Sequence, residues 1–208
     1  MRTLYSTYDK SLITDLPRAC FEGRIEVVQS VDMSERAVEF LMRQSILGFD
    51  TETRPTFRKG PMNPVALLQV STDELCFLFR LCMIGLPDCL IELLSDTHRL
   101  KIGLSLHDDF MRLSQSRSFT PGTFTDVQEV ARSMGIADQG LRRLYANVFG
   151  KRISKGQQLS NWEADVLSDA QKQYAATDAW ACIQLYREFF RLKEEGFKLL
   201  PTNQVETE

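Results

Sequence analysis

The sequence predicts an α/β protein built on a mixed β-sheet with helices on both faces. Two apolar runs, residues 65–70 and 75–79, flank a polar turn at residues 71–74, a pattern typical of an antiparallel hairpin. From residue 87 onward, strand-like and helix-like segments alternate, which is typical of neighbouring parallel strands. A hairpin followed by strand and helix units indicates a mixed sheet covered on both faces.

The predicted strands are short apolar runs bounded by polar or turn-forming residues. In chain order they are residues 25–31, 45–50, 65–70, 75–79, 100–106 and a short run around Phe124. Residues 1–24 show no clear period and are expected to wrap the domain. Residues 53–64 contain three prolines and one glycine, which predicts a loop.

Four of the six predicted helices begin at a residue that favours a helix N-terminus: Asp32, Pro87, Asp108 and Asp126. The six helices cover residues 32–44, 87–97, 108–116, 126–135, 139–149 and 167–194. Asp32 with Glu35, and Asp126 with Glu129, form D-x-x-E patterns in which the first residue caps the helix. Asp126 is therefore interpreted as a cap and not as a metal ligand.

The composition limits the class of protein. A chain of 208 residues that is 43% hydrophobic suits one substantial domain. The net charge of −3 argues against an overall basic surface but leaves local basic patches open. The five cysteines include no C-x-x-C pair, so neither a disulfide framework nor a zinc site is predicted. Reduced thiols fit a cytoplasmic protein best. No apolar stretch reaches 18 residues, so we expect no membrane span.

Two carboxylates lie at the end of the strand predicted over residues 45–50. Asp50 and Glu52 are two residues apart, so on an extended chain their side chains share one face, roughly 6 to 7 Å apart. Two like charges held this close repel each other unless they share a proton or a cation. The pair therefore predicts a site for one or the other.

Further acidic residues lie at two other places along the chain. Asp108 and Asp109 follow the strand predicted at residues 100–106, where either of them suits the N-cap of the next helix. Tyr174 and Asp178 are four residues apart in a predicted helix, which puts the phenol and the carboxylate on one face. Taken singly, these residues also fit a helix cap and a surface carboxylate beside a half-buried tyrosine.

Three motifs follow one another in a fixed order. They are Gly48-Phe49-Asp50-Thr51-Glu52, the segment from Gly103 to Asp109, and Ser160-Asn161-Trp162 followed by Tyr174-Ala175-Ala176-Thr177-Asp178. Together they resemble the signature of the DEDDy 3′→5′ exonucleases of the DnaQ-like superfamily, most closely the Werner-type and ribonuclease D branch. The resemblance covers residues 25–192 and implies a ribonuclease H-like fold.

The resemblance also implies the roles of the site residues. Two divalent cations, Mg²⁺ or Mn²⁺, would be held by four carboxylates: Asp50, Glu52, Asp109 and Asp178. Asp109 is preferred to Asp108 because the family's acid follows the strand at that offset. Tyr174 would orient the attacking water. Carboxylate oxygens suit these hard cations, and a pair of such ions can promote phosphodiester hydrolysis.

Two stretches without acidic residues, 53–71 and 139–162, carry positive charge. Their basic residues are Arg54, Arg58, Lys59, Arg142, Arg143, Lys151, Arg152 and Lys155. Such strips can follow a phosphate backbone, and the alternative is ordinary solvated charge. An aromatic side chain at Trp162 can stack a base or pack in the core. The candidate substrate contacts are Thr51, Arg54, Lys155 and Trp162.

The predicted function is a metal-dependent 3′→5′ exonuclease that acts on the single-stranded or recessed 3′ ends of DNA or RNA and releases nucleoside 5′-monophosphates. The alternative on the same fold is a nucleic-acid-binding module whose catalysis has decayed. The presence of all four acids and Tyr174 argues against decay. We expect an N-terminal extension at residues 1–24, the exonuclease domain at 25–200 and a flexible tail at 201–208.

Overall fold

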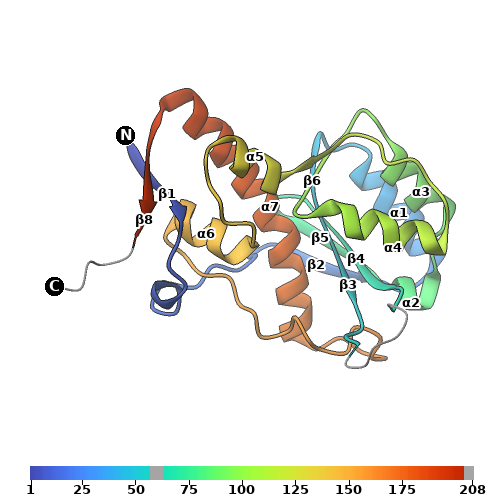
Figure 1. Ribbon diagram of the computed structural model, residues 1–208. Helices are drawn as coiled ribbons and strands as arrows, with labels where there is room; N and C mark the ends of the chain where they lie inside the picture. Colours follow the sequence, from blue (N-terminus) through green and yellow to red (C-terminus); the bar gives the residue numbers. More distant parts are fainter. Residues whose placement is uncertain (57–62, 204–208) are drawn as a thin grey trace.

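The central sheet of the computed structural model is mixed, as predicted. The structure describes residues 1–56 and 63–203, and within these the sheet has the strand order β2-β5-β4-β3-β6-β7 (Figure 1). The strands are β2 Arg24–Val28, β3 Ile46–Thr53, β4 Val65–Ser71, β5 Leu75–Phe79, β6 Leu100–Gly103 and β7 Phe124–Asp126. β4 is antiparallel to β3 and β5, whereas the other neighbours are parallel.

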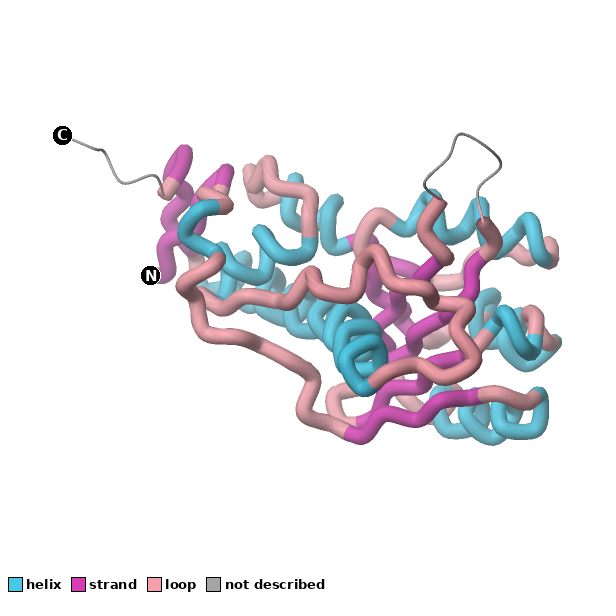
Figure 2. The backbone as a smooth tube through the Cα atoms, turned by 90° about the horizontal axis from the view of Figure 1, so that it is seen from below, coloured by secondary structure: helices cyan, strands magenta, loops and turns pink. Residues whose placement is uncertain are grey.

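Helices cover both faces of this sheet, which confirms the predicted layers. The helices are α1 Val31–Leu41, α2 Leu81–Ile84, α3 Asp88–Ser95, α4 Leu106–Ser116, α5 Val127–Ser133, α6 Leu141–Phe149 and α7 Asp169–Glu195. In Figure 2 the strands lie between the long α7 and the helices on the far side of the sheet. All residues of β4 are buried because both of its faces are covered. Among the described residues, none of the helices combines the length and the apolar composition that a membrane span requires.

The two faces of the sheet carry different cores. Leu68 and Val70 of β4 pack with α1, α3 and α4, whereas Leu67 packs with Trp162 and the first half of α7. This alternation follows from the two-residue period of a strand. Asp50 lies opposite Gln69 in the β3–β4 ladder, so it shares the face of Leu67, on which α7 lies.

The helix starts differ from the prediction by one or two residues, and hydrogen bonds account for two of these differences. Ser30 caps α1 by accepting a hydrogen bond from the Met33 amide, so Asp32 lies inside the helix. α4 begins at Leu106, two residues earlier than predicted, because the Leu106 amide donates to Asp126 Oδ2 at 3.1 Å. Asp126 Oδ1 also accepts from the Gln128 amide at 2.8 Å, which confirms Asp126 as the cap of α5.

A second sheet joins the two ends of the described chain. β1 Arg2–Thr7 pairs in parallel with β8 Phe197–Thr202, and neither strand was predicted. The expected fraying from residue 201 is wrong for Pro201 and Thr202, which belong to β8. Residues 204–208 of that predicted tail lie outside the described residues.

After β1 the chain wraps over the helices, as expected. The Ala19 amide donates to the Arg152 carbonyl at 2.9 Å, and the Phe21 amide donates to Thr177 Oγ1 at 3.0 Å. Thr177 precedes Asp178 on α7. The N-terminal segment is therefore tied to the helix that carries the last of the four predicted acids.

Candidate active site

A close helix-strand contact brings the first carboxylates together. Gly48 of β3 lies against α7 so closely that an added Cβ would lie 2.1 Å from the Ala179 carbonyl oxygen. Asp178 precedes Ala179, and Asp50 and Glu52 follow Gly48 along the face of β3 that α7 covers. The absence of a side chain at Gly48 thus allows α7 to bring Asp178 to the strand.

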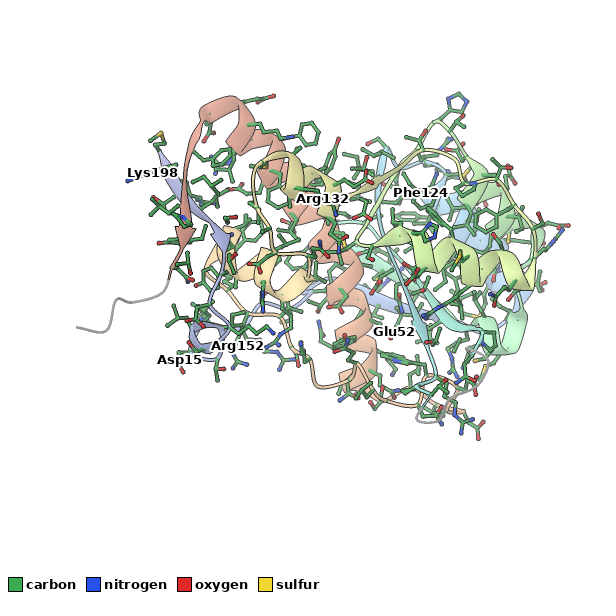
Figure 3. All side chains as sticks on the ribbon, viewed as in Figure 1. Asp15, Glu52, Phe124, Arg132, Arg152 and Lys198 are labelled. Atoms are coloured by element: carbon green, nitrogen blue, oxygen red, sulfur yellow. The ribbon has the colours of Figure 1, made fainter. Side chains whose placement is uncertain are left out.

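Three carboxylates converge at this contact. Asp50, Glu52 and Asp178 each offer one oxygen, and these oxygens all lie within 4.8 Å of one another. Figure 3 shows Glu52 beside the N-terminal half of α7. Asp178 is 8% exposed, whereas Asp50 and Glu52 are half-buried. The structure therefore brings together three of the four predicted acids at one point.

Asp109 lies next to this cluster, and Asp108 does not belong to it. Asp109 is half-buried on α4 and its Oδ1 accepts a hydrogen bond from the Thr51 hydroxyl of β3, whereas Asp108 is exposed. The negative charge of Asp109 contributes to raising the pKa of Asp50. Thr51, predicted as a substrate contact, thus lies in the site as the partner of Asp109.

The site raises the pKa of all four carboxylates. Burial is the main cause in each case, because it disfavours the charged form. Repulsion from Glu52 and Asp178 raises the pKa of Asp50 further. Burial raises the pKa of Asp109 to about 6, against the opposing effects of Thr51 and Arg112. Tyr174 and Arg142 partly offset the effect of burial on the pKa of Asp178.

The cluster fits a hard divalent cation. Asp178 Oδ1 is buried and has no hydrogen-bond partner among the described residues. A buried acceptor of this kind normally has a partner. A cation would satisfy this oxygen and neutralise the repulsion that raises the pKa of Asp50 and Glu52. The donor set is all carboxylate oxygen, which Mg²⁺ and Mn²⁺ prefer.

Tyr174 stands beside the cluster as a neutral phenol. It is 9% exposed, and burial together with the charges of Asp178 and Glu52 raises its pKa well above the ordinary value. Trp162 packs against it with ring centroids 6.0 Å apart. Trp162 is fully buried, so the prediction that it stacks a base is wrong and its alternative, packing in the core, is confirmed.

The predicted basic residues separate into different environments. Arg54 forms an ion pair with Glu163 at 3.2 Å, so its charge is partly neutralised beside the site. Arg152 Nε donates to the Leu16 carbonyl at 2.9 Å and holds the N-terminal segment. Arg58 and Lys59 lie outside the described residues.

A cavity of about 640 Å³ adjoins the carboxylates, and we call it the basic cavity. It is lined by Tyr174 and Asp178 and by the charged residues Lys10, Arg142, Arg143, Lys155 and Asp138. Lys155, which the sequence predicts as a substrate contact, thus lies next to the carboxylates. Lys10 was missed, because nothing in the sequence links residue 10 to residues 142–178.

Gln69 was also missed. It is fully buried directly opposite Asp50 in the β3–β4 ladder, and neither atom of its side-chain amide has a hydrogen-bond partner in the described protein. A glutamine in the otherwise apolar run of β4 was the signal that could have revealed it. Its amide adds a buried polar group on the face that carries the carboxylates.

Converging carboxylates on an interior strand of a mixed sheet and on the helix that covers it, beside a basic cavity, are the arrangement expected of a nuclease. Residues 25–192 match the family described as 3'-5' exonuclease, and the chain belongs to this family. This confirms the predicted family at the level of a 3′→5′ exonuclease related to the Werner-type and ribonuclease D proteins.

Relatives in three organisms support this assignment. "Exonuclease 3'-5' domain-containing protein 2" of Drosophila melanogaster is 33% identical over 82% of this chain. A "3'-5' exonuclease" of Arabidopsis thaliana is 32% identical over 69%, and the "Bifunctional 3'-5' exonuclease/ATP-dependent helicase WRN" of Mus musculus is 30% identical over 88%. The matches cover 30%, 52% and 14% of these relatives, so the chain spans about half of their length or less.

Solved structures share the fold. The EXO domain of Aedes aegypti Nibbler superposes with a TM-score of 0.76 at 23% identity, covering 86% of this chain and 95% of that domain. Escherichia coli RNase D gives 0.74 at 20% identity, covering 83% and 46%. Trypanosoma brucei RNase D in complex with RNA U12 gives 0.70 at 22% identity, covering 86% and 64%. These likenesses confirm the ribonuclease H-like mixed sheet.

We expect metal binding to stabilise the protein more strongly as the pH rises. A carboxylate whose pKa is raised on folding stabilises the folded state below its unfolded pKa, near 4, and that stability is lost as the pH passes its folded pKa. For Asp109 this loss is spread from about pH 4 up to its folded pKa of about 6, and for Asp50, Glu52 and Asp178 the pKa is also raised. Cations compete with these protons, so the metal-induced rise in melting temperature is expected to grow between about pH 5.5 and about pH 8.

Thermal melts with EDTA or Mn²⁺ over this pH range check the expectation. In EDTA the melting temperature should fall as the pH rises, and in Mn²⁺ the melting temperature should fall less over the same range. A metal-induced shift of the same size at every pH would contradict the protonation of the metal-free cluster.

Proposed function

We propose that this chain is a metal-dependent 3′→5′ exonuclease that hydrolyses phosphodiester bonds of nucleic acid and releases nucleoside 5′-monophosphates. The observation that carries the proposal is the convergence of Asp50, Glu52 and Asp178, with Asp109 beside them. Membership of the 3'-5' exonuclease family supports the polarity and the reaction class.

The four carboxylates would hold the cations. Two divalent ions, Mg²⁺ or Mn²⁺, would activate the attacking water and stabilise the leaving oxygen when bound. The unpartnered Oδ1 of Asp178 supports this role, as does the mutual repulsion that raises the pKa of Asp50. Thr51 fixes the orientation of Asp109 through its hydroxyl, which keeps this carboxylate directed at the cluster.

Tyr174 would orient the attacking water. Its raised pKa keeps the phenol protonated at neutral pH, so it acts as a hydrogen-bonding group and does not abstract a proton. The buried Trp162 packs against its ring and restricts its movement. Positioning of this kind contributes to the rate without a change in charge.

The proposed substrate is a single-stranded nucleic acid with a free 3′ end. The basic cavity next to Asp178 and Tyr174 supports this choice, because cationic side chains near a hydrolytic site favour phosphate backbones. Two proteins with a similar fold have been solved with a nucleic acid: Trypanosoma brucei RNase D in complex with RNA U12, and Brucella melitensis NrnC bound to pGG. Both DNA and RNA are therefore substrates to test.

A time course on 5′-labelled single-stranded DNA and RNA of one sequence tests the proposal. With Mg²⁺ or Mn²⁺ the products should shorten progressively from the 3′ end and release mononucleotides, and EDTA should stop the reaction. Asp50→Asn should be inactive under the same conditions. If the folded wild type binds the oligonucleotides but leaves both intact, the decayed binding module becomes the better interpretation.

Tyr174→Phe is expected to lower kcat by about 10- to 100-fold with little change in KM. The substitution removes the hydroxyl that positions water, whereas the ring that packs on Trp162 stays in place. Single-turnover kinetics measure the effect. Tyr145→Phe serves as a control, because Tyr145 is also a buried tyrosine but packs against Phe149. A kcat equal to that of the wild type would remove Tyr174 from the mechanism.

A further inference from the structure

The N-terminal segment forms part of the wall of the basic cavity. Lys10 and Ile13 line this cavity together with Tyr174 and Asp178. Both residues precede residue 25, where the match to the 3'-5' exonuclease family begins. A part of the chain outside the matched family region therefore reaches the immediate surroundings of the catalytic carboxylates.

This wall is held in place on both sides of Lys10. The Tyr8 amide donates to Asp138 Oδ2 at 2.6 Å, and the Asp9 amide donates to Asn203 Oδ1 at 2.6 Å. On the other side, the Ser11 amide donates to Asp9 Oδ1 at 2.8 Å. The pairing of β1 with β8 anchors the segment before these contacts. The position of the Lys10 backbone is thus fixed by hydrogen bonds, while its side chain is exposed.

The charge of the cavity is predominantly positive. Four cationic side chains line it, and two carboxylates, Asp138 and Asp178, oppose them. Asp138 is buried and paired with Arg143 at 2.7 Å, so these two charges neutralise each other. Asp178 belongs to the carboxylate cluster that it forms with Asp50 and Glu52. The remaining positive charge comes from Lys10, Arg142 and Lys155.

This positive charge adjoins the active site. Arg142 and Asp178 line the same cavity. Arg142 Nε donates to the Ile153 carbonyl at 2.9 Å, which links α6 to the segment that carries Lys155. Cations from three separate parts of the chain, represented by Lys10, Arg142 and Lys155, thus surround one volume beside Asp178.

We infer that the basic cavity binds a backbone phosphate of the single strand, next to the one that is hydrolysed, and that Lys10 is a substrate contact contributed by the N-terminal segment. The inference rests on the proposed exonuclease function. A lysine ammonium suits a phosphate group as a mobile point charge. A volume of about 640 Å³ is within the usual range of ligand sites, so a nucleotide unit fits this space.

Charge reversal at Lys10 tests the inference. Lys10→Glu is compared with Lys10→Ala and with the matched control Lys198→Glu, which lies on β8 far from Glu52 in Figure 3. For each protein, kcat and KM on a short labelled single strand are measured over a range of salt concentrations. Binding of the same strand is measured in EDTA by fluorescence anisotropy, and the Mn²⁺-induced rise in melting temperature is recorded.

Lys10→Glu is expected to raise KM at least about threefold and to weaken binding in EDTA by a similar factor, with a smaller effect for Lys10→Ala. The slope of log kcat/KM against log salt should become shallower by about 0.7 for Lys10→Ala, as for one lost phosphate contact on a single strand. kcat and the Mn²⁺-induced rise in melting temperature should stay at the wild-type values, because Lys10 is not one of the carboxylates that would hold the cations.

Two results would overturn the inference. One is a Lys10→Glu protein whose KM and binding equal those of Lys198→Glu, and the other is a wild type that does not bind the strand. A wild type that binds but does not hydrolyse would reject the proposed exonuclease function alone. In that case the loss of binding by Lys10→Glu still decides whether the cavity holds a phosphate.

Discussion

Asp178→Asn is expected to lower kcat/KM at least about 1000-fold while making the metal-free protein more stable. Asp178 supplies one of the three oxygens within 4.8 Å of one another, so its loss removes a ligand of the proposed metal site. The same substitution removes a charge that raises the pKa of Asp50 and Glu52 by repulsion. Asparagine has nearly the same shape, so packing against β3 is retained.

The gain in stability should be visible in EDTA above neutral pH. Relief of about 1 to 2 kcal/mol corresponds to a rise in melting temperature of roughly 3 to 6 °C for a chain of this size. The melting temperature should no longer respond to Mn²⁺. Asp169→Asn is the matched control on the same helix, because Asp169 is exposed and pairs with Lys172. A drop in metal-free stability would show that Asp178 is there for structure and not for cation binding.

Gly48→Ala is expected to destabilise the protein by about 3 kcal/mol or more and to abolish activity. An added Cβ would lie 2.1 Å from the Ala179 carbonyl oxygen, which is backbone and cannot rotate away. α7 must therefore move away from β3, and Asp178 moves with it. Such a loss lowers the melting temperature by roughly 6 to 12 °C.

Gly156→Ala is the control for this substitution. An added Cβ there would lie 3.4 Å from Ser154 Oγ, which is ordinary van der Waals contact, so the melting temperature should change little. Urea unfolding of both variants, together with activity at a temperature where both are folded, separates lost stability from a displaced Asp178. If Gly48→Ala melted like the wild type, the close contact between β3 and α7 would not be needed for the site.

The parts of the site that the sequence predicted depend on local periods. The two-residue repeat of a strand places Asp50 and Glu52 on one face, and the four-residue spacing in a helix places Tyr174 next to Asp178. Both relations survive folding because they are set by the backbone of a single element. The resemblance of the three motifs links these elements, although they lie far apart along the chain.

The parts that were missed depend on contacts between distant residues. Arg54 is neutralised by Glu163, 109 positions away, and no local pattern encodes that pairing. Trp162 was open to two interpretations, and its full burial is decided by how the segment before α7 packs on the sheet. β8 contains a proline and is mostly exposed, so it lacks the apolar alternation that identifies a strand.

The pairing of β1 with β8 also imposes an order on the assembly of a newly made chain. β1 emerges from the ribosome before the strands of the central sheet, yet its partner strand is completed about 195 residues after Thr7, at Thr202. Closing so long a loop is slow and becomes favourable after the rest of the sheet has formed. During translation, then, the four acids can come together before the segment that carries Lys10 is fixed in place, and the proposed phosphate contact of Lys10 would form after the carboxylate cluster.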